Sequence, residues 1–277
     1  MSIKITKADG STEYFKVEKL RRSLRRSGAG NDEVKMVVDK IMGEIYEGMR
    51  TQEIYRRAFE LLRTDEKRSV AARYSLRRAL FSLGPTGFPF ERFLARLFEY
   101  DGYNIRTGIT IHGRCAPHEL DVAAYHDTHS FVGEAKFHAR PGIKTDLQVV
   151  MYSYARLLDL QEKSICNEAV CGIKEFWLVT NTKFTSTAER YGECVGVKML
   201  SWDYPRRDNL HDRIQRAKIY PITVIQGLSM SQITTLISHD IIICSDLLKK
   251  PHILSSLHIS SNKKERVMQE VEEICGK

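Results

Sequence analysis

The chain has 277 residues, of which 42% are hydrophobic and 28% are charged, and its formal net charge is +8. This length suggests two or three domains, and the apolar content is high enough to exclude a disordered chain. No apolar run approaches the roughly 20 residues that cross a bilayer, and the N-terminus is charged from residue 4. We therefore expect a cytoplasmic protein with no membrane partner.

The six cysteines form no CxxC pair, which favours reduced thiols and argues against a zinc ribbon. The charge is uneven along the chain. Residues 1–83 hold 19 Lys or Arg and 12 Asp or Glu, residues 84–204 hold 13 and 15, and residues 205–277 hold 11 and 8. Basic ends suit partners that carry phosphate, whereas a slightly acidic middle suits a site for metal ions.

The first block, residues 1–83, starts as a β-hairpin and continues as helices. Short strands at 3–7 and 13–15 flank a turn at Asp9-Gly10. Apolar residues at helical spacing predict a helical bundle, with Thr51 as the N-cap of its third helix. The predicted helices cover residues 17–26, 32–46, 51–63 and 66–83.

The second block, residues 84–204, begins with the linker GPTGFP, in which Gly and Pro are concentrated. The patterns after it predict elements in the order α-β-β-β-α-β-α-β, which is typical of a mixed sheet flanked by helices. The chain as a whole is thus expected to be a multi-domain α/β protein. The predicted elements lie at 90–98, 103–107, 119–125, 131–137, 145–160, 175–181, 187–194 and 197–202.

The third block, residues 205–277, has only helical patterns. Short apolar segments alternate with Ser, Asp and Gly turns. They loosely resemble helix-hairpin-helix DNA-binding modules, in which backbone amides contact phosphates. A small helical bundle used for dimerisation is the alternative. The predicted helices lie near 206–218, 222–228, 231–237, 245–248 and 263–274.

Two charged residues, Glu134 and Lys136, share one face of a mostly apolar predicted strand. If Asp127-Thr128 form a two-residue turn before this strand, the numbers of facing residues add up to 255, and Asp121 faces Glu134. Like charges directly opposite each other destabilise a sheet, and a divalent cation between them removes the repulsion. Lys136 would then lie beside the cation, near a water or a phosphate oxygen. A shift of one residue in register would place Asp121 on the other face.

These residues resemble the D…ExK signature of the PD-(D/E)xK nuclease superfamily, and more closely the Mrr-like restriction endonucleases and archaeal Holliday-junction resolvases. In those enzymes a helix before the sheet carries a glutamate near the site, which Glu91 in FPFERFLARLFEYDGYNI matches. Gln148 and the segment FWLVTNTKFTSTAERYG match later parts, whereas Leu120 replaces the proline of the signature. The resemblance covers about 84–204 and implies metal-dependent hydrolysis of a DNA phosphodiester.

The resemblance also implies a role for each residue. Asp121, Glu134 and the carbonyl of Ala135 would bind Mg²⁺ or Mn²⁺, with Glu91 as a further or water-mediated ligand. Lys136 would position the attacking water, and Gln148 would hold the nucleic-acid backbone or the lysine.

Each residue taken singly has an ordinary alternative. Glu134 and Lys136 could form a surface salt bridge, Glu91 lies in a first helical turn, where the helix dipole favours an acid, and Gln148 could close a capping box. No motif indicates another enzyme class, because the sequence lacks GxxxxGK[ST], GxGxxG, GxSxG and HExxH.

The N-terminal block resembles the ATP-cone, a regulatory nucleotide-binding domain of ribonucleotide reductases and their repressor. The segments IKITKADGSTEYFKVEKL (3–20) and RSVAARYSLRRAL (68–80) carry the resemblance. It implies that the hairpin and helices enclose ATP or dATP. Ala8 stands where an arginine is usual, so one phosphate contact is missing, which weakens binding unless other basic residues such as Arg21 or Arg22 compensate. A basic helical module that contacts DNA is the alternative. The implied nucleotide contacts are Ile5, Lys7, Glu13, Lys16, Lys19, Thr51, and Arg77 or Arg78.

Taken together, these features predict a Mg²⁺-dependent DNA endonuclease of restriction or defence type that is regulated by ATP or dATP and forms a homo-oligomer. The alternative is a nucleotide-sensing, DNA-binding regulator with an inactive nuclease fold. RNA or a repair intermediate as the substrate stays open at this point.

Overall fold

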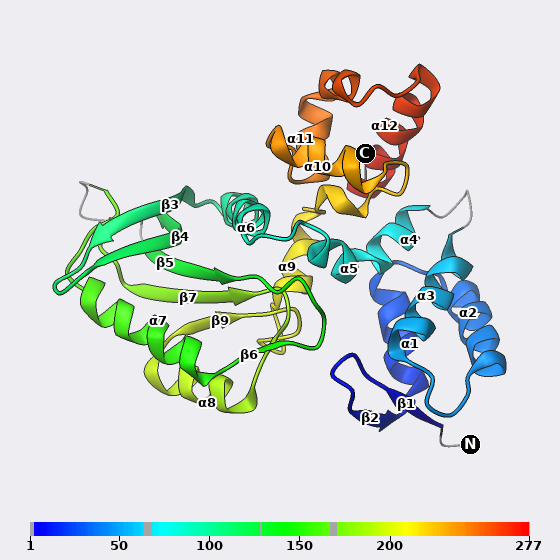
Figure 1. Ribbon diagram of the computed structural model, residues 1–277, viewed down its shortest axis with the longest axis horizontal. Helices are drawn as coiled ribbons and strands as arrows, with labels where there is room; N and C mark the ends of the chain where they lie inside the picture. Colours follow the sequence, from blue (N-terminus) through cyan, green and yellow to red (C-terminus); the bar gives the residue numbers. More distant parts are fainter. Residues whose placement is uncertain (1–2, 64–67, 128, 167–170, 277) are drawn as a thin grey trace. The chain divides into compact units, whose positions relative to one another are not determined.

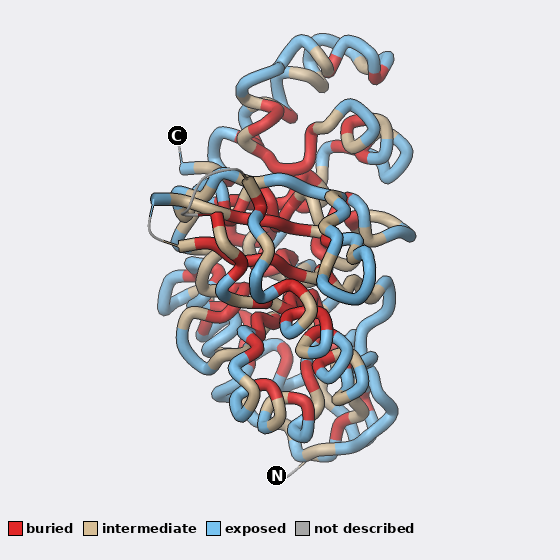
Figure 2. Tube along the Cα trace, turned by 90° about the vertical axis from the view of Figure 1, so that its left-hand side faces the viewer, coloured by how far each residue is buried: buried red, intermediate tan, exposed pale blue. Residues whose placement is uncertain are grey.

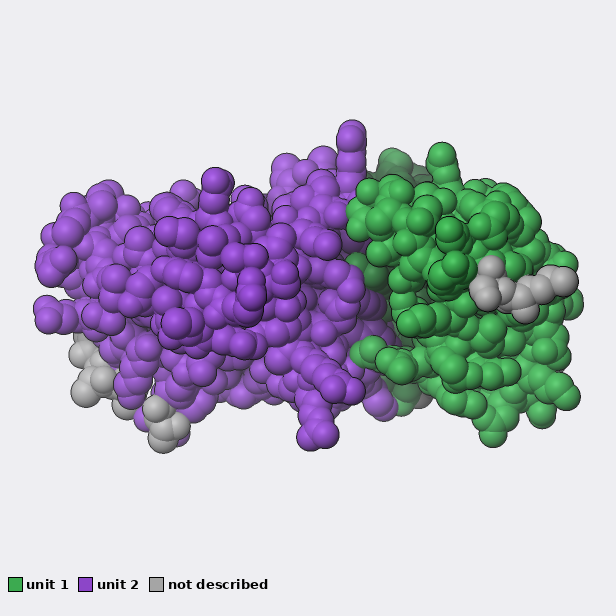
Figure 3. Space-filling view, turned by 90° about the horizontal axis from the view of Figure 1, so that it is seen from below, with its two compact units in different colours: residues 1–79, 222–277 green, residues 80–221 purple. Residues whose placement is uncertain are grey.

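The computed structural model describes residues 3–63, 68–127, 129–166 and 171–276. Its contacts group the chain into two compact units, which Figure 3 shows in different colours. Unit 1 combines residues 1–79 with 222–277, and unit 2 contains residues 80–221. The predicted multi-domain α/β class is confirmed. The three blocks of the sequence become two units, because most of the third block packs with the first.

Unit 1 begins with an antiparallel hairpin of β1 (Lys4–Thr6) and β2 (Thr12–Tyr14), in which Ile5 pairs with Glu13. Helices with buried inner faces follow, as predicted, and apolar residues of the first four form one core with Ile5 of the hairpin (Figure 2 marks buried residues in red). They are α1 (Val17–Arg26), α2 (Asn31–Glu44), α3 (Thr51–Leu62), α4 (Arg68–Tyr74) and α5 (Leu76–Phe81).

Two details of these helices differ from the prediction. The N-cap of α3 is Arg50, whose extended backbone also forms a bridge to Thr6, so Thr51 is the first helical residue. The single helix predicted over 66–83 is divided into α4 and α5 at Ser75, whose hydroxyl donates to the Ala72 carbonyl at 2.8 Å. Such side-chain bonds to nearby backbone compete with regular helix. Residues 64–67 lie outside the described residues.

The C-terminal part of unit 1 is helical, as predicted. Its last helix packs against α4, and the Thr223 hydroxyl donates to the Ala79 carbonyl at 2.7 Å. The buried Glu270 accepts hydrogen bonds from the backbone of Gln226 and Gly227 at 2.7 and 3.1 Å. The elements are η3 (Ile222–Val224), α10 (Met230–Ser238), α11 (Cys244–Lys249), the unpredicted η4 (Pro251–Leu257) and α12 (Ser261–Cys275).

Unit 2 is built on a mixed sheet with strand order β3-β4-β5-β7-β9 (Figure 1). Neighbouring strands are antiparallel from β3 to β5 and parallel from β5 to β9. The strands are β3 (Asn104–His112), β4 (Pro117–His126), β5 (His129–Lys136), β7 (Glu175–Thr180) and β9 (Lys198–Leu200), and β6 (Lys144–Thr145) pairs separately with β8 (Lys183–Phe184). The helices are α6 (Phe88–Tyr100), α7 (Leu147–Leu160), α8 (Ser186–Val195) and α9 (Leu210–Ala217).

Helices α6 and α7 cover opposite faces of this sheet. The ring of Phe98 on α6 lies 5.0 Å from that of Phe131 on β5, whereas Leu157 on α7 belongs to the same core cluster as Val132. Successive side chains of a strand point to opposite faces, so Phe131 points toward α6 and Val132 points toward α7. Gly133 comes next, and a Cβ there would lie 2.7 Å from the Trp177 carbonyl oxygen, so β5 and β7 approach closely just before Glu134.

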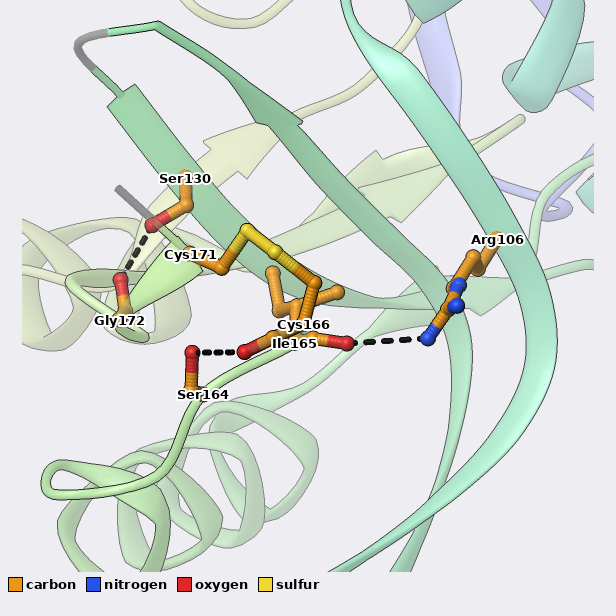
Figure 4. Close-up of a disulfide and its surroundings, with 7 residues drawn as sticks. All are labelled: Arg106, Ser130, Ser164, Ile165, Cys166, Cys171 and Gly172. Carbon is orange, nitrogen blue, oxygen red and sulfur yellow. Dashed lines mark hydrogen bonds between the residues drawn. A yellow bond between two sulfur atoms is a disulfide. The ribbon is translucent and has the colours of Figure 1, made fainter. Parts of the chain in front are cut away.

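Cys166 and Cys171 form a disulfide, with their Cα atoms 5.4 Å apart (Figure 4). The expectation of reduced cysteines is therefore wrong for this pair. The cause lies in the path of the chain rather than in a motif, because residues 163–165 and 171–173 run antiparallel and bring the thiols together. The supporting bonds are Ile165 N to Cys171 O at 2.8 Å, Ile173 N to Lys163 O at 2.9 Å, and Arg106 Nη1 to Ile165 O at 3.0 Å.

No helix within the described ranges is both long and apolar enough to cross a membrane.

Candidate active site

Asp121 on β4 and Glu134 on β5 lie where the pairing of these two strands ends. The facing pairs run from His126 with His129 to Val122 with Gly133, so the predicted register, in which residue numbers add up to 255, is confirmed. The pairing ends one position before Asp121 and Glu134, which the same register, if continued, would set opposite each other. Here Asp121 Oδ2 accepts a hydrogen bond from the backbone N–H of Ala135 at 2.7 Å. A carboxylate thus takes the place of a backbone acceptor at this point of the sheet.

Glu91, in the first turn of α6, belongs to the same electrostatic cluster. Burial raises the pKa of Glu91 to about 7, and the charges of Asp121, Glu134 and Glu119 add to the rise. Burial also raises the pKa of Asp121, the Ala135 hydrogen bond opposes this, and the charge of Glu134 raises it further. Glu91, Asp121 and Glu134 thus come from three elements, and the charges of Asp121 and Glu134 add to burial in raising the pKa of Glu91.

The raised pKa of Glu91 predicts a pH-dependent gain in stability for Glu91→Gln. The folded protein holds this proton more tightly than the unfolded chain, so the wild type loses stability as pH rises from 4.5 to about 7. Because the group is only partly buried, solvent screening reduces the effect to about 1 kcal/mol. We expect the variant to exceed the wild type by that amount in urea unfolding at pH 8 and to match it at pH 4.

Glu99→Gln, in the exposed last turn of the same helix, is the matched control. If the free energy of unfolding of Glu91→Gln differed from that of the wild type by the same amount at both pH values, the ionised Glu91 carboxylate would not be the destabilising group.

Arg156 is a site residue that was not predicted from the sequence. It lies on α7, is 3% exposed, and its Nη1 donates to Glu134 Oε2 at 2.5 Å. Its Nη2 donates to the backbone carbonyl of Glu119, so one side chain bridges β4 and β5 beyond their last pair. The sequence feature that could have indicated it is a charged residue on a helix stripe whose other members, including Ser153 and Leu160, are buried.

Lys136 lies two residues beyond Glu134 on the same face of β5 and is half-buried. Among the described residues it forms no ion pair with a carboxylate, and the partner of Glu134 is Arg156 instead. The ordinary alternative of a Glu134–Lys136 salt bridge is therefore wrong. The charge of Lys136 adds to burial in lowering the pKa of His138.

The chain just after Lys136 is fixed by Asn181, which is fully buried after β7. Its Oδ1 accepts from the His138 backbone N–H and its Nδ2 donates to the His138 carbonyl, both at 2.9 Å. The imidazole Nε2 of His138 lies 3.1 Å from the hydroxyl of Thr145. Asn181 was not predicted from the sequence, because no local pattern indicates a partner 43 residues away.

Gln148 does not join this cluster through a hydrogen bond between the described residues, and its side chain is exposed at the start of α7. The helix predicted from residue 145 begins later, because its N-cap is Asp146, which accepts from the backbone of Gln148 and Val149 at 3.1 and 3.4 Å. Thr145 is instead buried and pairs with Phe184 between β6 and β8.

The donor set at this site suits a hard cation. Asp121, Glu134 and the Ala135 carbonyl offer oxygen ligands, and Mg²⁺ commonly takes one or two carboxylates together with waters and phosphate. Within the described ranges, no group of three or more His, Cys, Asp or Glu side chains could hold a metal ion by itself. A cation here would therefore depend on the backbone carbonyl, water and substrate for further ligands.

The residues implied as nucleotide contacts cluster in part around Glu13. Lys19 pairs with it at 2.8 Å, and this hydrogen bond, with the charges of Lys19, Lys7 and Lys16, lowers the pKa of Glu13. Ile5 faces Glu13 across the hairpin and is buried. Thr51 starts α3, next to the Arg50 bridge to the hairpin. Arg77 and Arg78 lie on α5, where the Arg78 charge acts on Tyr55 of α3.

In the comparison with known proteins, two family models match the ends of the chain. Residues 3–81 match the ATP cone domain, which confirms that part of the predicted resemblance and indicates nucleotide-sensing regulation. Residues 220–275 match a family described as AF1548-like, C-terminal.

Relatives cover the larger part of the chain. An uncharacterized protein of Archaeoglobus fulgidus is 30% identical over 184 residues, which are 66% of this chain and 100% of that protein. The solved structure titled "Crystal Structure of Protein of Unknown Function AF1548" matches with a TM-score of 0.56 and 29% identity, covering 69% of this chain and 99% of that one. The chain therefore belongs to the family of this uncharacterized archaeal protein and carries an ATP cone domain at its N-terminal end.

Proposed function

We propose that the chain is a Mg²⁺-dependent DNA endonuclease whose activity responds to ATP or dATP bound at the ATP cone. The observation that supports this is the setting of Glu91, whose pKa is raised to about 7 by burial first and then by the charges of Asp121 and Glu134 at the end of the β4–β5 pairing. Carboxylates that repel one another beside a half-buried lysine are a costly arrangement for a site with no ligand. A divalent cation and a phosphate would compensate both kinds of charge.

The roles of the residues follow from their positions. Asp121, Glu134 and the Ala135 carbonyl would hold Mg²⁺ or Mn²⁺, which supplies polarisation of the scissile phosphate and a more acidic water. Glu91 would bind through a water or remain a proton acceptor near pH 7. Lys136 would orient the attacking water or stabilise a phosphate oxygen, and Gln148, exposed at the start of α7, would contact the DNA backbone.

Regulation would be a coupling between two binding sites on one chain. If ATP or dATP at the cone changes the affinity for DNA or the assembly of the homo-oligomer, then DNA must change the affinity for the nucleotide by the same factor. The lysines around Glu13 supply positive charge for the phosphates of such a ligand.

The test of the proposed function is cleavage of supercoiled plasmid DNA by the full chain. We expect nicked or linear product with Mg²⁺ or Mn²⁺, no product in EDTA, and a rate that changes when ATP or dATP is added. Double-stranded RNA and branched DNA serve as alternative substrates in parallel. No cleavage of any of these with either metal would overturn the nuclease proposal.

A second function is favoured by one observation, the ion pair between Arg156 and Glu134. If the guanidinium is the permanent counter-ion of Glu134, the site needs no cation, and the chain is a nucleotide-sensing, DNA-binding regulator with an inactive nuclease fold. This reading requires DNA binding that depends on ATP or dATP, together with thermal stability that does not respond to Mg²⁺.

A further inference from the structure

The outward face of α1 is strongly basic. Four arginines fall within six residues of this ten-residue helix, and Leu20 and Leu24 bury its opposite side. The single acid of the helix is Glu18 in its first turn. The arginines are Arg21, Arg22, Arg25 and Arg26, and Lys16 and Lys19 precede them.

The available acids compensate only part of this charge. Arg21 pairs with Glu18 at 2.5 Å and Lys19 pairs with Glu13 at 2.8 Å. Arg22 and Arg25 are exposed, and neither forms an ion pair with a carboxylate in the part of the chain that the structure describes. These two side chains are therefore available to an external anion.

The spacing of the arginines is unfavourable for the helix by itself. Arg21 with Arg25, and Arg22 with Arg26, are two pairs at i and i+4, where like charges destabilise a helix by about 0.2–0.5 kcal/mol each. Basic residues in a last turn do favour the helix dipole. That benefit applies to Arg25 and Arg26 and does not explain Arg21 and Arg22 one turn earlier.

The expected nucleotide contacts lie elsewhere on this element. Lys16 is the N-cap of α1 and Lys19 lies in its first turn, and the charges of both act on Glu13 of the hairpin. Arg25 follows Lys19 by six residues, or about 9 Å along the helix. A triphosphate held at the hairpin would therefore leave the arginine end of α1 exposed.

We propose that the exposed face of α1 around Arg22 and Arg25 binds the phosphate backbone of duplex DNA. Residues at i and i+3 present side chains about 5–6 Å apart, and the guanidinium group forms paired hydrogen bonds with phosphate oxygens. A duplex offers a dense row of such groups, so both arginines bind at once. The contact carries no base recognition and weakens as counterions compete at higher salt.

This docking surface is independent of the proposed cleavage chemistry, because it involves no residue of the carboxylate cluster. The ATP cone would then have two binding sites, one for the nucleotide at its hairpin and one for DNA at the far end of α1. Both ligands are anions, so nucleotide at the cone would reduce the positive field that attracts the DNA.

The test measures binding of a labelled 30-base-pair duplex by fluorescence anisotropy in EDTA, between 50 and 200 mM salt. The variant Arg22→Gln/Arg25→Gln keeps helix propensity and removes two positive charges. We expect weaker binding for every duplex sequence and a salt dependence, d log K/d log[salt], that is smaller by about 2. Circular dichroism melting checks that the variant is folded.

The matched control is Lys35→Gln/Lys40→Gln, which removes the same charge from exposed positions on α2. It should bind as the wild type does. Equal losses in both double variants would mean that only net charge matters, and would overturn the proposal. A wild type that binds no duplex, or an arginine variant that loses ATP binding and keeps DNA binding, would also overturn it. Because EDTA prevents metal-dependent cleavage, this result stands apart from the plasmid assay.

Discussion

Lys136→Ala should lower the rate of Mg²⁺-dependent DNA cleavage by about 100-fold to 1,000-fold while leaving the fold intact. The expected size is that of losing one preorganised group that stabilises developing charge. Lys136 has no carboxylate partner among the described residues, so its removal breaks no ion pair there. Initial rates of plasmid cleavage, with thermal melting as the folding check, provide the measurement.

Asp121→Asn separates cation binding from the rest of the site. The amide keeps an oxygen for the backbone N–H of Ala135, which lies 2.7 Å from the carboxylate, but it removes the charge. We expect loss of cleavage and loss of any Mg²⁺-induced rise in melting temperature. For Lys136→Ala, the control for lysine removal is Lys198→Ala in the same sheet, since Lys198 is 50% exposed and its 3.7 Å pair with Glu175 contributes little. Wild-type cleavage by both Lys136→Ala and Asp121→Asn would contradict the site assignment.

The register that places Asp121 and Glu134 together was predictable because it depends on a local feature. A two-residue turn fixes the pairing of the strands on either side, and the alternation of side chains then fixes the face. The pairs from His126 with His129 to Val122 with Gly133 follow that rule. Thr128, one of the two turn residues, lies outside the described residues.

Helices with a clear apolar stripe were also predictable from the sequence. The bounds of α1 are those expected from its leucine spacing, and α3 and α7 differ from prediction mainly at their caps. Thr145 and Asp146 are adjacent residues, and both types are good caps. The choice between them depends on the pairing of β6 with β8, which local sequence does not encode.

The parts that could not be predicted depend on contacts between distant segments. Arg156 reaches the Glu119 carbonyl across 37 positions, and Asn181 holds His138 across 43. The disulfide is of the same kind, because the antiparallel return of the chain, not a CxxC motif, brings Cys166 to Cys171. In each case the sequence contains the residue type, whereas only the fold supplies its partner.

Arg156→Met should lower the free energy of unfolding by about 3 kcal/mol, the largest stability effect that we expect from a single change in this site. The substitution removes the counter-ion of Glu134, whose side chain is 27% exposed, and also the donor to the Glu119 carbonyl. Urea unfolding at pH 7 measures the loss. Arg96→Met is the control, since Arg96 pairs with the exposed Glu99 at 3.4 Å and should contribute less than about 1 kcal/mol.

Adding Glu134→Gln to Arg156→Met should restore about 1–2 kcal/mol, because a neutral amide needs no counter-ion. A double variant no more stable than Arg156→Met alone would show that Arg156 acts only through packing and the Glu119 carbonyl.

The same variant distinguishes the two proposed functions. If Glu134 is a cation ligand, Mg²⁺ should stabilise Arg156→Met more than the wild type, because the cation then replaces the positive charge that Arg156 supplied to Glu134. If Arg156 is instead the permanent partner of an inactive site, neither protein should respond to Mg²⁺ in thermal melting. The Mg²⁺ response of Arg156→Met therefore tests whether this ion pair occupies a metal site or replaces one.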